Sequence, residues 1–448
     1  MIGSGVVGSS VVGRGISGTG MTSAPGGGAT AFPRPAGFTW DPGIQFFTDG
    51  TTSFDFDAVA IAPLVAGGIT EYYVSQSGSD ANSGLTALLP KKGLDAIMAT
   101  AAGAATATVR INIAAGDYGY GDYPGSGGVA GKNVIFKVTS GTVKTGPFSK
   151  GSALTWTLSS GTCYSATRSN TVGVRDYGSL NSYGDPRKYS LAANLATCQA
   201  TAYTYFVSGS TVYVNNGLGQ PSANIFVMVG VSNTTFSSNY TWVLDGGKSG
   251  RLELLGGSTG SLRCTGGGAN QKLYCRNVWF RFSGDNNLYC YGVPLVVLQG
   301  GGGSGSTADI MNYHIESGRI PNVVEIGLTC YDAGSNAAGN NNCSTAHDAV
   351  QIVRFAGRYW GSDGPVVADV TAGTRSWAIL CHAYGSLKND DSSVDASWLA
   401  STGDCQMWLD GCEFNGGSSR YDMSAGTGSA IYYKGRAPVT STGSVAAY

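Results

Sequence analysis

Residues 71–97 read EYYVSQSGSDANSGLTALLPKKGLDAI and contain the most specific structural signals in the chain. It opens with a short aromatic run of the kind enriched in β-strands. A loop rich in Ser, Gly, Asp and Asn follows, in which Asp and Asn bond their own backbone and Gly supplies positive φ. Residues 91–105 then have the spacing of an amphipathic helix, with Leu94, Ile97 and Met98 on one face. Residues 108–120 predict a second strand, which ends in Gly-Asp-Tyr.

Short apolar, β-like runs recur through the rest of the chain. Most of them end in Gly, Asn or Ser, and they begin roughly twenty residues apart, the length of one coil of a β-solenoid. An all-β sandwich also has short strands and turns, but it would not normally sustain this pattern for so long. The runs are 251–257, 272–284, 288–302, 311–318, 322–334, 348–357, 365–373, 376–386, 406–417 and 429–435.

The order of elements in residues 71–120 resembles the N-terminal entry of pectate-lyase-like right-handed parallel β-helix proteins. This entry is common in bacteriophage tailspikes and in secreted polysaccharide-degrading enzymes. The resemblance is carried by the Tyr-Val-Ser run, the Gly-Ser-Asp-x-Asn-x-Gly loop, the Pro-Lys step, the short helix and Gly-Asp-Tyr; Gly93-Leu94 replaces the usual Thr-Leu pair. It implies an all-β, right-handed parallel β-helix whose first coil is capped by the short helix.

Composition divides the chain into four parts. Residues 1–36 are rich in Gly, Ser and Val and are expected to dock onto a larger particle rather than fold alone. Residues 37–70 are expected to form a small β connector, because 53–65 alternate apolar and polar residues. Residues 71–435 form the predicted β-helix body, with a paired-strand insert at about 200–230, and 436–448 form a tail.

The low charge of the chain excludes several classes of function. Charged residues make up 12% of the sequence and the net charge is −1, so the clustered Lys and Arg of a nucleic-acid-binding protein are missing. No apolar run approaches the ~20 residues of a membrane span. The N-terminus lacks the pattern of a signal peptide, so we expect synthesis in a cytoplasm without export by the usual route.

The chain has ten cysteines and three histidines, and no cysteine lies in a CxxC pair, which argues against zinc. We expect most thiols to be buried as small hydrophobic groups, with Cys330 and Cys343 as the best disulfide candidates. Asp80, Asn82 and Gly84 are spaced like the start of a calcium loop, but the later ligands are missing, so a turn is favoured over a structural calcium site. No other cofactor is expected.

Candidate site residues concentrate between positions 347 and 384. His347, Asp348 and His382 are the candidates for acid–base catalysis. Arg could bind sugar carboxylates and aromatic rings could stack on sugars; these candidate substrate-binding residues are Arg354, Arg358, Tyr359, Trp360 and Tyr384. The alternative is that His347 and Asp348 fix a corner of a coil and that the aromatic residues fill the core.

Three functions are compatible with the sequence. The first is a bacteriophage virion spike that attaches through residues 1–70 to other virion proteins and recognises, or depolymerises, host surface polysaccharide. The second is a secreted polysaccharide lyase or hydrolase, and the third is a purely structural virion protein. The resemblance implies a homotrimer on the virion, with a host glycan as partner, no nucleic acid and no membrane insertion.

Overall fold

The computed structural model describes residues 26–125, 129, 131–334, 340–386, 396–415 and 420–448. Most of the expected docking segment, residues 1–25, lies outside this range, as do 335–339 of the Asn/Gly-rich loop before His347. Within the described ranges, no helix is long and apolar enough to cross a membrane.

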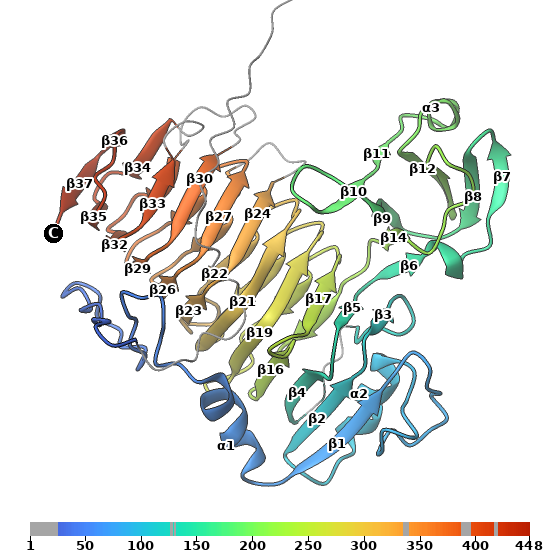
Figure 1. The fold of residues 1–448 in the computed structure, drawn as a ribbon, viewed down its shortest axis with the longest axis horizontal. Helices are drawn as coiled ribbons and strands as arrows, with labels where there is room; N and C mark the ends of the chain where they lie inside the picture. Colours follow the sequence, from blue (N-terminus) through green and yellow to red (C-terminus); the bar gives the residue numbers. More distant parts are fainter. Residues whose placement is uncertain (1–25, 126–128, 130, 335–339, 387–395, 416–419) are drawn as a thin grey trace, which may run out of the picture.

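The body of the molecule is a parallel β-helix, as expected, with three sheets that run along its length (Figure 1). Its strand-to-strand crossovers take the right-handed form that parallel connections adopt. The first sheet contains β1 (Ile69–Val74), β2 (Thr108–Ile113), β4 (Asn133–Val138), β16 (Thr241–Asp245), the first part of β19 (Lys272–Arg281) and of β21 (Leu295–Ser304), β23 (Asn322–Ile326), β26 (Gln351–Phe355), β29 (Arg375–Ile379), β32 (Gln406–Asp410), β35 (Ala430–Lys434) and β37 (Ser444–Ala447).

The second sheet continues from the first through β19 and β21, and the third is a separate nine-stranded sheet. The second sheet contains β3 (Gly116–Tyr118), β5 (Thr142–Thr145), β17 (Arg251–Leu255), the later parts of β19 and β21, β24 (Thr329–Ala333), β27 (Arg358–Ser362), β30 (His382–Ser386) and β33 (Glu413–Asn415). The third contains β15 (Thr234–Phe236), β18 (Leu262–Cys264), β20 (Leu288–Tyr291), β22 (Met311–His314), β25 (Ser344–Ala346), β28 (Val367–Asp369), β31 (Ala396–Ala400), β34 (Tyr421–Ala425) and β36 (Ser441–Thr442).

The first coil forms as the sequence predicts. The helix α2 (Leu94–Ala102) buries Leu94, Ile97 and Met98 against this end of the core. The carboxylate of Asp80 accepts hydrogen bonds from the backbone N–H groups of Lys92 and Gly93, at 3.0 and 2.9 Å. The loop before the helix is therefore a turn that the side chain of Asp80 closes, and no group of three potential metal ligands occurs in the described residues.

The cysteines line the interior of the molecule. All ten are buried and unbonded, which agrees with their expected role as small hydrophobic groups. The prediction of a disulfide between Cys330 and Cys343 is wrong for this structure, because both are free thiols inside the β-helix.

The corner between β26 and β27 shows how a coil turns without a left-handed glycine. A glycine at a corner is expected to take a positive φ, but here Ala356 has the positive φ, of 52°, and Gly357 does not. Gly357 is required for space instead, because an added Cβ would lie 2.4 Å from the hydroxyl oxygen of Tyr359.

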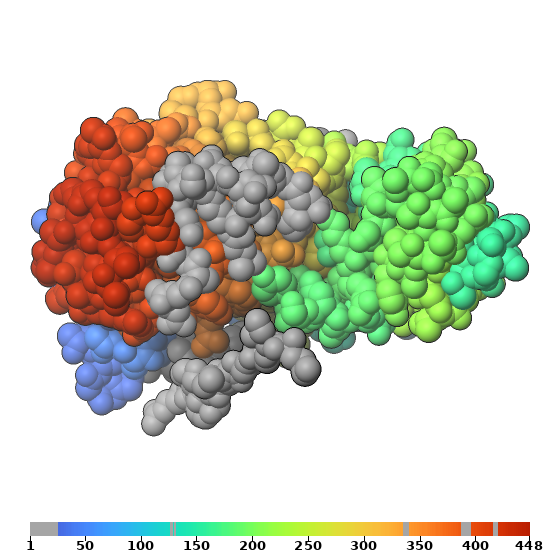
Figure 2. Space-filling view, turned by 90° about the horizontal axis from the view of Figure 1, so that it is seen from above, coloured from blue at the N-terminus to red at the C-terminus, as the bar shows by residue number. Residues whose placement is uncertain are grey.

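A large insert separates β5 from β15 and is a lobe beside the N-terminal coils (Figure 1). The lobe projects from one end of the molecule in the space-filling view (Figure 2). The expected paired strands are β12 (Thr204–Ser208) and β13 (Thr211–Asn215), but the insert begins near residue 148 and has its own core. Its remaining elements are β6 (Phe148–Lys150), η2 (Gly151–Ala153), β7 (Thr157–Ser160), β8 (Cys163–Thr167), β9 (Thr171–Leu180), β10 (Pro186–Lys188), β11 (Ser190–Leu191), α3 (Leu195–Ala200) and β14 (Ile225–Val229).

Residues 26–65, which we call the N-terminal belt, lie along the outer face of the first sheet. Phe38, Phe46, Phe54 and Phe56 are buried there against one apolar cluster of the sheet. The side chains that they cover come from strands spread along the sheet: Ile135, Val243, Tyr274, Val297, Val324, Ile326, Val353, Phe355, Trp377, Ile379 and Trp408. The first sheet is therefore buried on both faces.

The expected strands in residues 53–65 are wrong, because this part of the belt is helical. It forms η1 (Asp57–Ile61), which continues directly into α1 (Ala62–Val65). The carboxylate of Asp55 accepts from the N–H groups of Asp57 and Ala58, at 2.9 and 3.1 Å, and so caps the helical segment.

The belt makes the N-terminal region part of the fold rather than an independent connector. We predict that a chain beginning at residue 71 melts at a lower temperature than one beginning at residue 26 and binds a hydrophobic dye such as ANS. The reason is that removal of the belt exposes aromatic side chains such as Phe355 and Trp377. Equal melting temperatures and no dye binding would show that the belt contributes little to folding.

Candidate functional site

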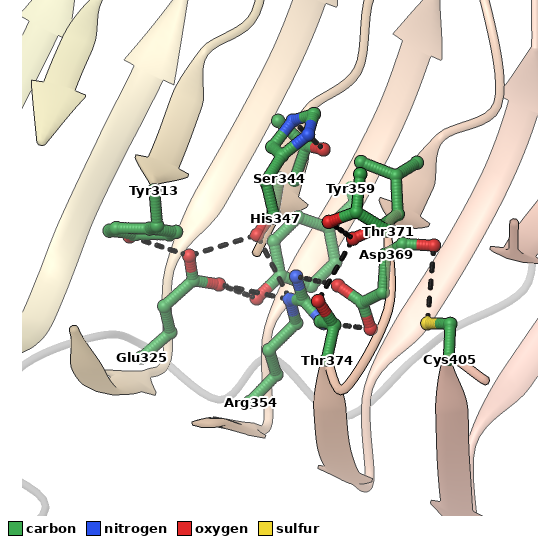
Figure 3. A network of polar contacts seen from close by, with 12 residues as sticks. Tyr313, Glu325, Ser344, His347, Arg354, Tyr359, Asp369, Thr371, Thr374 and Cys405 are labelled. Carbon is green, nitrogen blue, oxygen red and sulfur yellow. Dashed lines mark hydrogen bonds and ion pairs between the residues drawn. The ribbon is translucent and has the colours of Figure 1, made fainter. Parts of the chain in front are cut away.

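Arg354 and Tyr359 lie inside the β-helix, where neither can bind a polysaccharide. Both are fully buried, and so is Glu325, which joins them (Figure 3). Arg354 donates two hydrogen bonds to the carboxylate of Asp369, at 2.8 and 3.1 Å, and its Nε lies 3.7 Å from Oε2 of Glu325. Their assignment as substrate-binding residues is therefore wrong: they belong to the core.

Hydrogen bonds satisfy the rest of this buried network. The hydroxyls of Tyr313, Ser344 and Tyr359 donate to the carboxylate of Glu325, at 2.8, 2.9 and 2.6 Å. Burial alone would lower the pKa of Arg354, but the carboxylates of Asp369 and Glu325 hold it above its ordinary value. The network is thus an internal ion cluster that ties adjacent coils together.

We predict that Arg354→Ala destabilises the protein by about 3–5 kcal/mol, because it leaves two buried carboxylates without a cation. Arg358→Ala is the matched control: this arginine is exposed on the next strand, and its loss should change stability by about 0.5 kcal/mol or less. Urea unfolding of the two variants measures the difference. Similar losses would mean that the internal cluster does not stabilise the coils.

His347 and Asp348 lie at the corner between the third and first sheets, together with the third histidine, His314. Nδ1 of His314 is 2.9 Å from Oδ2 of Asp348, and the rings of His314 and His347 stack with centroids 3.7 Å apart. Burial lowers the pKa of His347 to about 3, so the ring is neutral at physiological pH. Asp348 has a φ of 56°, and its Oδ1 accepts from the hydroxyl of Thr371, as expected of a side chain that fixes a corner.

Arg358, Trp360, His382 and Tyr384 lie on the outer face of the second sheet. Trp360 stacks between Tyr331 and Tyr384, with ring centroids 4.7 and 5.7 Å apart, and His382 contacts Tyr384 at 4.5 Å. Arg358 and His382 occupy the same position on neighbouring strands. These four residues share one face, but His347 and Asp348 are on another side of the coil, so the candidate catalytic residues His347, Asp348 and His382 do not lie together.

The insert is anchored to this same second sheet by a buried acidic residue. Asp185, just before β10, forms an ion pair with Arg281 and accepts a hydrogen bond from the hydroxyl of Tyr331 at 2.7 Å. Tyr183 from the same loop lies 5.8 Å from the ring of Tyr331. These contacts fix the insert against the aromatic stack and so define the space between the two lobes.

A cleft of about 490 Å³ lies at this junction, and we call it the junction cleft. The β-helix lines it with the turns at 282–284 and 305–307, and the insert with β9, β10, β11, β12 and β14. Its polar and aromatic lining includes Arg175, Lys188, Tyr189, Tyr205 and Phe282. Clefts of this size at the boundary of two lobes are the usual place for a ligand.

Asp332 lies beside the junction cleft on β24. Its carbonyl accepts from the backbone N–H of Gly305, a lining residue, at 3.0 Å. Burial raises the pKa of its carboxyl to about 6, although the charges of Arg175 and Lys188 lower it in part. A carboxyl group of this kind is partly protonated near neutral pH and can donate a proton.

We predict that Asp332→Asn stabilises the protein at pH 7.5 relative to wild type and has much less effect at pH 4. The folded-state pKa lies above the ordinary value of 3.8, so wild-type stability falls as pH rises from 4 through 6, and an uncharged residue escapes this loss. Asn also tolerates the φ of 61° at this position. Melting temperatures across this pH range test it, and parallel curves would contradict a raised pKa.

The sequence reasoning missed the residues of the junction cleft. Arg175 stands in a β-like run, TVGVRDYG, at 171–178, and the only signal there was an arginine at a strand position, which is seldom buried without a partner. Asp332 was one of many acidic residues in the later coils, and only the fold shows which of them the insert partly covers.

Comparisons with known proteins support the fold. No protein-family model matches the chain, and no curated protein matches it. A solved structure titled "Glycoside hydrolase" matches with a TM-score of 0.51 at 10% identity, over 84% of this chain and 95% of that chain. At this identity the likeness shows the fold and not the activity, and the bacteriophage type of the family resemblance stays a prediction.

Two further structures align less well. The complex of XylC with xylose has a TM-score of 0.44 at 11% identity, over 81% of this chain and 68% of that one. Pectate lyase Pel9A has a TM-score of 0.35 at 11% identity, over 85% and 78%. These scores are too low to add to the comparison.

Proposed function

We propose that the protein binds a polysaccharide in the junction cleft. The observation that carries this proposal is the cleft itself: a space of about 490 Å³ with charged and aromatic side chains, held open between two anchored lobes. The half-exposed rings of Trp360 and Tyr384 extend this surface along the second sheet, from the loop that contains Tyr183 and Asp185. Aromatic rings combined with a few polar groups are the chemistry that sugar rings and hydroxyls require.

The chemistry of the site favours binding over hydrolysis by two carboxylates. A glycoside hydrolase of the usual kind needs an acid and a second carboxylate on either side of the bond. Asp332 could serve as the acid, but the neighbouring Asp185 is fully buried in its ion pair with Arg281. Bond cleavage is therefore a second candidate, which rests on Asp332 alone.

The proposal includes the biological setting that the family resemblance implies. In that setting the ligand is a host surface polysaccharide, the protein is a homotrimeric bacteriophage spike, and its N-terminus attaches to other virion proteins. The low charge and the Gly-rich residues 1–36 support this setting. A secreted lyase or hydrolase and a structural virion protein are the alternatives.

Calorimetric titration with a panel of bacterial capsular and lipopolysaccharide O-chains tests the proposal. We predict that Ser190→Trp, on the exposed rim of the cleft, weakens binding about tenfold or more by filling the space, while the melting temperature is unchanged. Ser208→Trp, on an exposed end of β12, is the matched control and should bind normally.

Failure of every polysaccharide to bind, or normal binding by Ser190→Trp, would contradict the site. Products of the same incubations separate the alternatives: unsaturated ends that absorb ultraviolet light indicate a lyase, shortened chains without them indicate a hydrolase, and intact chains indicate binding alone.

A further inference from the structure

Arg175 is a buried cation that forms no ion pair, although the nearby charges of Asp332 and Asp185 partly offset the effect of burial on its pKa. Its side chain lines the junction cleft at 6% exposure, and no ion pair joins it to any carboxylate in the described part of the chain. It stacks on the ring of Phe282 at 4.1 Å and makes a long hydrogen bond of 3.5 Å to the carbonyl of Pro186. Burial lowers its pKa to about 10, which leaves it charged at neutral pH. A buried charge of this kind is normally paired.

Most of the neighbouring charges at the junction form ion pairs with one another and not with Arg175. Arg281 pairs with Asp185 and lies 3.5 Å from Glu253, and Arg251 pairs with Glu253 at 3.2 Å. Lys188 adds a second positive charge to the lining of the cleft. Of the remaining acids, Asp176 is buried and accepts a hydrogen bond from the hydroxyl of Tyr189 at 3.2 Å, and Asp332 lies near Arg175 and Lys188 and offsets these two cations only in part. The cleft therefore carries excess positive charge.

We infer that the ligand of the junction cleft is an acidic polysaccharide, with an anionic group of the sugar bound by Arg175 and Lys188. This inference rests on the proposed function and adds the class of substrate to it. The planar guanidinium group presents paired donors that match a carboxylate, and a sulfate ester offers the same oxyanion chemistry. Binding of such a group supplies the ion pair that the protein does not form with Arg175.

Gly305 keeps the approach to Arg175 open. Its φ is 68°, and a Cβ there would lie 2.8 Å from the ring of Phe282 and 3.4 Å from Nη2 of Arg175. A side chain at this position would thus displace the ring on which the guanidinium rests and crowd the group itself. The glycine preserves both the stack and the space in front of it.

The experiment compares acidic polymers with neutral forms of the same polymers. Alginate, hyaluronan and polygalacturonate are each titrated before and after carbodiimide–borohydride reduction of their carboxyl groups, with dextran sulfate as the sulfated polymer and dextran as its neutral counterpart. The proteins are the full chain, Arg175→Gln, Arg175→Lys and the control Arg187→Gln. Arg187 lies on β10 of the same insert, but its guanidinium stacks on Tyr203.

We expect binding to at least one acidic polymer, a loss of about tenfold or more in Arg175→Gln, partial recovery in Arg175→Lys and no change in Arg187→Gln. Reduction of the carboxyl groups should abolish binding if they are the anionic group, and dextran sulfate should bind if a sulfate is. Binding should weaken as salt is added. Melting curves of Arg175→Gln and Arg175→Lys distinguish a lost contact from a lost fold.

Two outcomes would overturn the inference, and they differ in what they say about the proposed function. Equal binding of the carboxyl-reduced or uncharged polymers, unchanged in Arg175→Gln, would keep a polysaccharide site and reject the acidic substrate. Binding of no polymer in this panel or among the bacterial polysaccharides would reject both.

Discussion

The fold depends on one constraint: each strand of a sheet hydrogen-bonds to the equivalent strand of the next coil. The register is therefore fixed residue by residue, and side chains stack in columns that run the length of the molecule. Val323, Ile352 and Met407 occupy one inward column of the first sheet, and Val324, Val353 and Trp408 the neighbouring outward one. The spatial neighbours of a residue are therefore set by its position in the coil and not by its distance along the chain.

The same constraint explains the internal ion cluster. Glu325 and Arg354 are paired in register on adjacent strands of the first sheet, and both point inward. Charges in the interior are costly unless they neutralise one another and every polar atom finds a partner. Stacking supplies both conditions here, because Tyr313, Ser344 and Asp369, on three successive strands of the third sheet, all reach Glu325 or Arg354.

The sequence predicted the body of the fold because its signals are local. The loop closed by Asp80, the helix at 94–102 and the recurring apolar runs each depend on neighbouring residues. The site was not predictable in the same way, because whether Arg354 points inward and Arg358 outward depends on register, and a shift of one residue exchanges the faces. The belt was missed for a related reason: the apolar pairs Val323-Val324 and Ile352-Val353 indicate a sheet covered on both faces, but not which segment covers it.

The belt also sets an order of events during synthesis. Its aromatic residues leave the ribosome long before the sheet that they cover is complete, because Phe38 packs on Trp377 and Trp408, which are made more than 300 residues later. The nascent chain must therefore carry an apolar N-terminal segment with no docking face until the late coils have formed. The belt can therefore pack only when the first sheet is complete. A chain that stops short, or stacks its coils out of register, leaves those aromatic rings exposed.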